Sequence, residues 1–116
     1  RLGFVSEATL EALYAGARLF IYPSRYEGFG LPVVEAMAHG IPCIIADSAC
    51  LIEVARGAAL IVDPEDPIGF SDAISTALES EVWLRQAALA GKAVAGTYSW
   101  DECVNRMIDI YRTVPD

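Results

Sequence analysis

The feature that most constrains the fold is a strand, a glycine-rich turn and a helix in immediate succession. The apolar run Arg18–Tyr22 predicts the strand, and Gly28 and Gly30 lie in the turn. Pro32 fits the first position of a helix that ends near Gly40. Such a junction is typical of α/β proteins. Its backbone N–H groups and the helix dipole can together hold a phosphate.

Two carboxylates flank this turn. Glu27 lies within it, and Glu35 lies about one turn into the helix. Because helical side chains point back toward the helix N-terminus, we expect Glu35 to project toward the turn that carries Glu27. A phosphate site between two carboxylates suits a ligand that has both a phosphate and several hydroxyls, such as a sugar nucleotide.

Short apolar runs alternate with helical patterns along the rest of the chain. Further strands are predicted over residues 42–46 and 59–62, and helices are predicted after Ser6, over residues 51–55, after Asp66, over residues 81–93 and from Ser99 onward. Continuous apolar strands that alternate with helices indicate a parallel sheet covered on both faces. The prediction is an α/β fold, a Rossmann-like doubly wound parallel sheet.

Length and composition limit the class of protein. The 116 residues are expected to form one domain, and 54% hydrophobic with 21% charged residues is a globular composition. The net charge of −8 disfavours binding to nucleic acid or to anionic lipid. No apolar run approaches the ~20 residues of a transmembrane helix, so no transmembrane segment is expected.

The predicted sheet has few strands for such a fold. Gly3–Val5 is interpreted as the tail of a further strand, and the chain opens on Arg1 without a methionine. We therefore expect a domain truncated at its N-terminus. An uncovered parallel edge would allow self-association.

The cysteines, the histidine and the tryptophans are given structural roles. Free, mostly buried thiols in a reducing cytosol are expected, with Cys43 in a strand and Cys103 beside the apolar face of the last helix. With one histidine and no CxxC pair, the sequence contains no set of residues with the spacing of zinc ligands. His39 is expected to cap a helix C-terminus, and Trp83 and Trp100 are expected to be packing anchors.

The turn lies within a longer pattern. The run Pro23-Ser24-x-x-Glu27-Gly28-Phe29-Gly30-Leu31-Pro32-x-x-Glu35-Ala36-Met37-Ala38-x-Gly40-x-Pro42 resembles the signature of retaining glycosyltransferases of the GT4 family, which have the GT-B fold. Leu13–Ala17, Val62–Pro64 and Tyr98–Trp100 resemble other landmarks of that family, so the resemblance covers nearly the whole chain.

The resemblance implies a role for each residue of the motif. The chain would be the C-terminal half-domain that binds the donor, with Glu27 as the catalytic residue that accepts hydrogen bonds from donor-sugar hydroxyls. The backbone at Gly28, Phe29, Gly30 and Leu31 would contact the sugar or the diphosphate. Glu35 would hold the ribose hydroxyls of the nucleotide. No metal or cofactor is implied, and the donor would be a nucleotide-diphosphate sugar.

The resemblance also implies the reaction and its partners. A sugar would be transferred with retention of anomeric configuration, as in polysaccharide biosynthesis, and the leaving diphosphate would deprotonate the acceptor. The acceptor, a saccharide or a lipid-linked sugar, would bind an N-terminal domain that is absent here, so this chain alone is expected to be inactive. The full-length protein is expected in the cytoplasm, or at the cytoplasmic face of a membrane. The basic residues that neutralise the diphosphate would lie before Arg1, with Arg25 and Arg56 as the nearest candidates inside the chain.

Two alternatives remain open at this point. A non-catalytic module that binds nucleotide sugars, or has a regulatory role, could have kept the same fold and both glutamates. A response-regulator receiver would fit the length and acidity. Asp47 could mimic its phosphorylated residue, but no acidic pair follows Val5.

Overall fold

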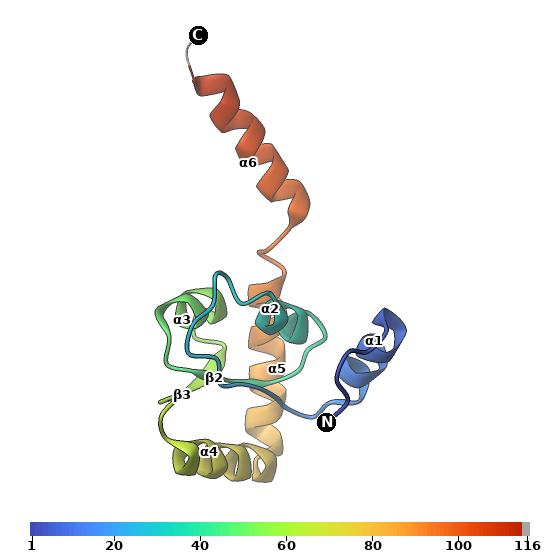
Figure 1. Cartoon of the computed structure of the whole chain (residues 1–116), viewed down its shortest axis with the longest axis vertical. Coiled ribbons are helices and arrows are strands. Elements are labelled where there is room, and N and C mark those ends of the chain that lie inside the picture. Colours follow the sequence, from blue (N-terminus) through green and yellow to red (C-terminus); the bar gives the residue numbers. More distant parts are fainter. Residues whose placement is uncertain (115–116) are drawn as a thin grey trace.

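Three parallel strands form the sheet of the computed structural model, which describes residues 1–114 (Figure 1). They are β1 (Phe20–Tyr22), β2 (Cys43–Ala46) and β3 (Ala59–Val62), in the order β1-β2-β3. Cys43 of β2 pairs with Phe20 on one side and with Ala59 on the other. The prediction of an α/β fold with a parallel sheet is confirmed.

Within the described residues, six helices precede, connect or follow the strands: α1 (Glu7–Gly16), α2 (Leu31–Ala38), α3 (Ala49–Ala55), α4 (Pro67–Glu79), α5 (Glu81–Ala95) and α6 (Trp100–Thr113). Four of these helices have a side-chain N-cap, because Ser6, Asp66, Ser80 and Ser99 each accept a hydrogen bond from a backbone N–H in the first turn. Within residues 1–114, none of these helices combines the length and the apolar character that crossing a membrane requires.

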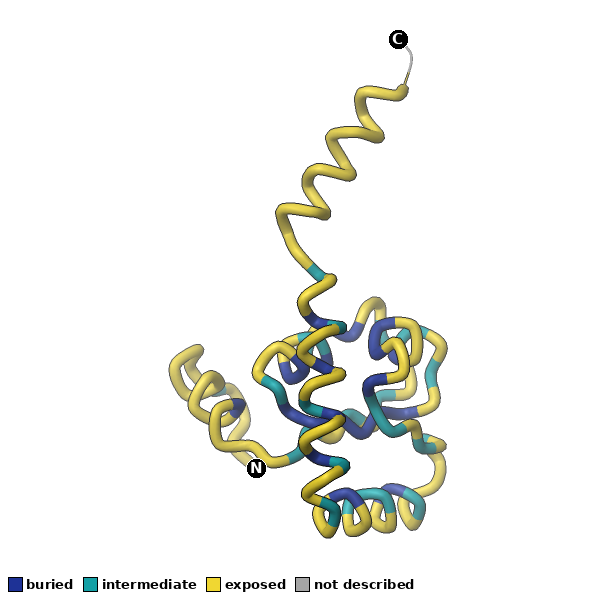
Figure 2. The backbone as a smooth tube through the Cα atoms, turned by 180° about the vertical axis from the view of Figure 1, so that it is seen from behind, coloured by how far each residue is buried: buried dark blue, intermediate teal, exposed yellow. Residues whose placement is uncertain are grey.

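The core lies between the sheet and the helices that pack on it. All four residues of β2 are buried, and Met37 of α2 is fully buried beneath α5. Gly91 of α5 permits this close packing, since a Cβ there would lie 3.2 Å from the Met37 Cγ. Figure 2 shows these buried residues gathered where α2, α3 and α5 meet the sheet. The loop between β1 and α2 therefore joins a strand of the sheet to a helix that is packed in the core.

The segment Gly3–Val5 is not a strand, contrary to the prediction. Gly3 has a left-handed φ of +67°, and the Phe4 side chain is fully exposed. A strand forms only where a neighbouring strand satisfies its backbone groups, and these residues pair with none in the part of the chain that the structure describes. Their apolar character alone was not enough to place them in the sheet.

Helix α6 points away from the rest of the chain (Figures 1 and 2). All its residues are exposed, including Trp100 at 78% and Cys103. The predictions that Trp100 is a packing anchor and that Cys103 is largely buried are therefore wrong, because no element within residues 1–114 covers either side chain. Trp83 packs against the core, as predicted, and Cys43 is a buried free thiol.

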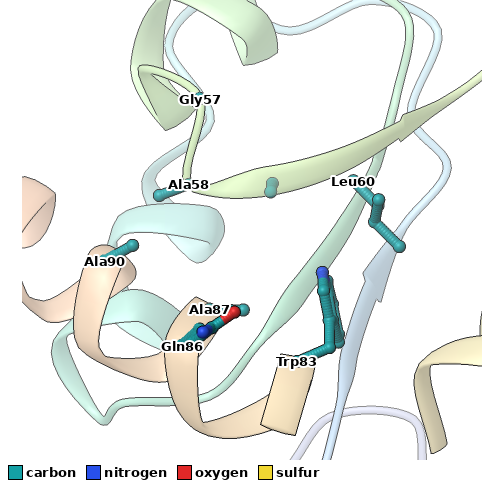
Figure 3. A pocket seen from close by; sticks show the side chains of 8 residues that line it. Gly57, Ala58, Leu60, Trp83, Gln86, Ala87 and Ala90 are labelled. Carbon is teal, nitrogen blue, oxygen red and sulfur yellow. The ribbon is translucent and has the colours of Figure 1, made fainter. Parts of the chain in front are cut away.

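A cavity of about 260 Å³ lies between β3 and the start of α5 (Figure 3). Trp83 forms one wall, and Ala58, Leu60, Ala87 and Ala90 contribute short apolar side chains. None of its lining residues is ionisable, and none belongs to the turn between β1 and α2. The cavity is therefore separate from the predicted site.

Candidate functional site

The loop between β1 and α2 brings the chain directly from the sheet to the start of a helix. Gly30 is the N-cap residue of α2 and has a left-handed conformation, with φ +90° and ψ 38°. A Cβ at this position would lie 2.7 Å from the Leu51 Cδ2 of α3. Glycine is required here for two reasons, because a side chain would strain the backbone and would collide with the core.

Gly30→Ala is therefore expected to lower the free energy of unfolding by about 1–3 kcal/mol. Gly28→Ala is the matched control, because Gly28 has no positive φ and its Cβ would meet no atom within 4 Å. Denaturant unfolding of both variants measures the difference. Equal stability of the two variants would show that Gly30 is not constrained as described.

The backbone N–H groups of Phe29, Gly30 and Leu31 are left free by this geometry. No side chain caps the N-terminus of α2, and within residues 1–114 these three N–H groups have no hydrogen-bond acceptor. The carbonyl of Phe29, by contrast, accepts a hydrogen bond from the Cys50 Sγ at 3.1 Å. Free N–H groups at the positive end of a helix dipole can bind an anion.

The Phe29 side chain lies against the segment that leads to α6. Its ring meets the edge of the Tyr98 ring at a centroid distance of 5.7 Å, and the Tyr98 hydroxyl donates to the carbonyl of Val54 at 3.2 Å. The Arg56 guanidinium lies 4.9 Å from the centroid of the same Tyr98 ring. Through Tyr98, the loop is thus in contact with the C-terminal end of α3.

Glu27 lies at the middle of the loop and is partly exposed. Its Oε1 accepts hydrogen bonds from the Tyr22 hydroxyl at 2.6 Å and from the Ser24 hydroxyl at 2.8 Å. These two bonds, with Tyr22 the stronger cause, lower the pKa of the Glu27 carboxyl below its ordinary value. The carboxylate is therefore ionised at neutral pH and acts as a hydrogen-bond acceptor.

Glu35 lies on the exposed side of α2, facing α1. Its Oε2 accepts a hydrogen bond from the Tyr14 hydroxyl at 3.1 Å. Together with Glu7, Glu11 and His39, both residues line a cavity of about 240 Å³ between the two helices. His39 is the C-cap residue of α2, as predicted, and its Nε2 lies 3.5 Å from the Glu11 carboxylate.

The predicted residues follow one another from the loop to the second turn of α2, but Glu35 is hydrogen-bonded to Tyr14 of α1 and lines a cavity that includes no residue of the turn, so its expected projection toward Glu27 is not observed. The structure also shows three partners that sequence reasoning did not assign to the site: Tyr14, Tyr22 and Ser24. Ser24 belongs to the motif and Tyr22 directly precedes it. Tyr14, however, is 21 residues from Glu35, and nothing in the local sequence indicates their contact.

Two other predictions concern the Arg25 side chain and the presence of a metal site. Arg25 forms an exposed ion pair with Glu65 at 2.9 Å, as befits a loop residue in solvent. Among residues 1–114, no group of three or more His, Cys, Asp or Glu side chains is arranged to hold a metal ion.

Comparison with known proteins identifies the family. The sequence pattern of the family described as Glycosyl transferases group 1 matches residues 1–94, which include every element of the loop and of α2. The chain belongs to this family. Its match spans the sheet and the candidate site together.

Individual relatives agree with this assignment. The chain is 41% identical over 111 residues to O-antigen chain mannosyltransferase B of Escherichia coli, covering 96% of this chain and 29% of that protein. In structure it is similar to the sucrose-phosphate synthase of Thermosynechococcus elongatus, with a TM-score of 0.86, 29% identity and coverage of 96% and 29%. It also has the fold of Anabaena HepE, solved in complex with UDP, with a TM-score of 0.79, 23% identity and coverage of 92% and 30%.

The chain thus spans less than a third of the length of these proteins. Its α/β fold corresponds to one half-domain of a GT-B glycosyltransferase, as the sequence predicted.

Proposed function

We propose that this chain forms part of the donor site of a retaining glycosyltransferase of the GT4 group. The donor is a nucleotide-diphosphate sugar, and the acceptor is a saccharide or lipid-linked sugar held by a part of the protein that this chain does not span. The observation that carries the proposal is the uncapped N-terminus of α2, with three free N–H groups in the same loop that carries the hydrogen-bonded carboxylate of Glu27.

The diphosphate lies at the free N–H groups of Phe29, Gly30 and Leu31. Negative charge develops on this group as the bond to the sugar breaks, and N–H donors fixed at a helix N-terminus stabilise such charge. The Phe29 carbonyl accepts a hydrogen bond from the Cys50 Sγ, which adds a contact between the loop and α3. Preorganised donors of this kind need no rearrangement during the reaction.

Glu27 holds the sugar, and Glu35 holds the nucleotide. The ionised Glu27 carboxylate accepts hydrogen bonds from sugar hydroxyls, which is a charge-assisted interaction. Glu35 accepts hydrogen bonds from the ribose hydroxyls, since it lies farther along α2 and is exposed. The UDP bound to HepE, a protein of the same fold, supports a nucleotide ligand for this chain.

The proposed reaction is tested with the full-length protein and a panel of UDP-, GDP- and ADP-hexoses offered with saccharide acceptors. Release of nucleoside diphosphate reports transfer, and the one-bond carbon–proton coupling of the new anomeric centre reports its configuration. The expected product has the anomeric configuration of the donor. An inverted product would overturn the retaining mechanism. Failure of every donor would overturn the transferase assignment.

A further inference from the structure

We infer that Tyr14 and Tyr22 are positioning residues, which orient Glu35 and Glu27 so that each carboxylate presents one oxygen to the donor. This inference rests on the proposed function. It adds two residues outside the loop-and-helix motif to the site, and it assigns a separate task to each oxygen of the two carboxylates.

The first part of the argument concerns Glu27. Both of its hydrogen bonds, from Tyr22 at 2.6 Å and from Ser24 at 2.8 Å, end on the same oxygen, Oε1. Within residues 1–114, Oε2 accepts no hydrogen bond and remains available to a ligand. The Ser24 hydroxyl has a second acceptor, the carbonyl of Tyr26 at 3.2 Å, and has only one proton to donate. Tyr22 is therefore the more constant partner of Glu27.

The second part concerns Glu35. The Tyr14 hydroxyl donates to its Oε2, and Oε1 has no hydrogen-bond partner in the described part of the chain. Tyr14 is 8% exposed, and its ring stacks on the His39 ring at a centroid distance of 4.9 Å. A buried, stacked ring holds its hydroxyl in one place. An exposed glutamate on the surface of α2 otherwise has several rotamers of similar energy.

The third part is the connection between the two tyrosines. The Phe20 ring of β1 lies between them, at centroid distances of 6.1 Å from Tyr14 and 5.8 Å from Tyr22. The three rings form a row from α1 to the end of β1. Because the rings are packed against one another, the two hydroxyls are held at fixed places relative to the sheet. Their hydrogen bonds then orient the carboxylates of Glu35 and Glu27.

Both hydroxyls keep their protons in the working pH range. Burial, together with the hydrogen bond to Glu35, raises the pKa of Tyr14 to about 12, and the hydrogen bond to Glu27 is the main reason that the pKa of Tyr22 is also about 12. Each tyrosine is thus a constant donor. A carboxylate oriented before binding loses less conformational entropy when the ligand arrives.

The test replaces each tyrosine by phenylalanine in the full-length protein, which keeps the ring and removes only the hydroxyl. Loss of one hydrogen bond predicts an effect of about 2- to 12-fold. Tyr14→Phe is expected to weaken binding of the nucleoside diphosphate to that extent. Tyr22→Phe is expected to lower kcat to that extent, with nucleotide binding within about twofold of the unmodified protein. Tyr111→Phe on α6 is the control.

A double-variant experiment separates positioning from a general structural effect. If Tyr14 acts through Glu35, Tyr14→Phe has no further effect on nucleotide binding in a protein that already contains Glu35→Gln. Additive losses would overturn the inference. If Glu35→Gln itself left binding unchanged, the proposed function would fail instead, so the two failures are distinguishable.

A readout without any ligand completes the test. Carbon NMR of the Glu27 carboxyl measures its pKa, which is expected to rise toward its ordinary value in Tyr22→Phe because the strongest stabilising hydrogen bond is lost. Tyr26→Phe in the same loop is the control, since the exposed Tyr26 hydroxyl makes no hydrogen bond within residues 1–114. An unchanged Glu27 pKa in Tyr22→Phe would contradict the assignment.

Discussion

Glu27→Ala in the full-length protein is expected to lower kcat by about 100-fold or more, with the affinity for the bare nucleoside diphosphate unchanged. The partner of Glu27 is the donor sugar, and its carboxylate is ionised and fixed by Tyr22 and Ser24. An interaction that is strongest while the sugar is being transferred acts on turnover rather than on nucleotide binding.

Steady-state kinetics with the donor, and calorimetric binding of the nucleoside diphosphate, measure the two quantities separately. Glu79→Ala on α4 is the matched control, because Glu79 is exposed and lies on a helix outside the site. A variant at Glu27 that lost nucleotide affinity but kept its turnover would show that Glu27 contacts the nucleotide, not the sugar.

Glu35→Ala is expected to show the opposite pattern, with the affinity for the nucleoside diphosphate reduced by about 1–3 kcal/mol. That loss corresponds to roughly 5- to 150-fold in the dissociation constant. The reason is the loss of charge-assisted hydrogen bonds from the ribose hydroxyls to an exposed carboxylate on α2.

The measurement is calorimetric titration of the full-length variant with UDP, GDP and ADP, with Glu79→Ala again as the control. Whichever nucleotide the unmodified protein prefers is expected to lose affinity. Unchanged affinity for that nucleotide in Glu35→Ala would remove the ribose role and leave Glu35 only its hydrogen bond with Tyr14.

Much of the fold follows from local sequence patterns. The apolar runs at β2 and β3 are bounded by turn residues, and Ser6 and Ser99 cap the helices that they precede. These signals depend on backbone hydrogen bonding over a few residues, which is why the elements begin and end within about two residues of their predicted bounds. Gly28 and Gly30 were assigned to the turn from the sequence, but the left-handed conformation of Gly30 at the N-cap of α2 was not predicted.

The wrong predictions share a different physical origin. Gly3–Val5 and α6 are apolar enough to be buried, yet burial depends on a partner surface, which a local pattern does not contain. Trp100 and Cys103 were assigned to a core that α6 does not reach. Amphipathic spacing predicts that a face can be covered; it does not identify what covers it.

In the candidate site, too, the local pattern was predicted from the sequence and the tertiary contacts were not. The spacing of the motif placed Glu27 and Glu35 on either side of the start of α2, and the structure has them there. Their hydrogen bonds to Tyr22 and Tyr14 were not predicted. The contact between Tyr14 and Glu35 joins two helices that are separated by a strand in the sequence, so only the packing of α1 against α2 reveals it.

The central claim is that the start of α2 and the loop before it bind the nucleotide diphosphate. The most direct measurement is hydrogen-exchange mass spectrometry of the full-length protein, with and without saturating UDP, GDP or ADP. The account predicts that the preferred nucleotide slows exchange in peptides covering residues 28–35, where three N–H groups are free, and leaves the peptides of α4 unchanged. Nucleotide binding with unaltered exchange over residues 28–35 would contradict it.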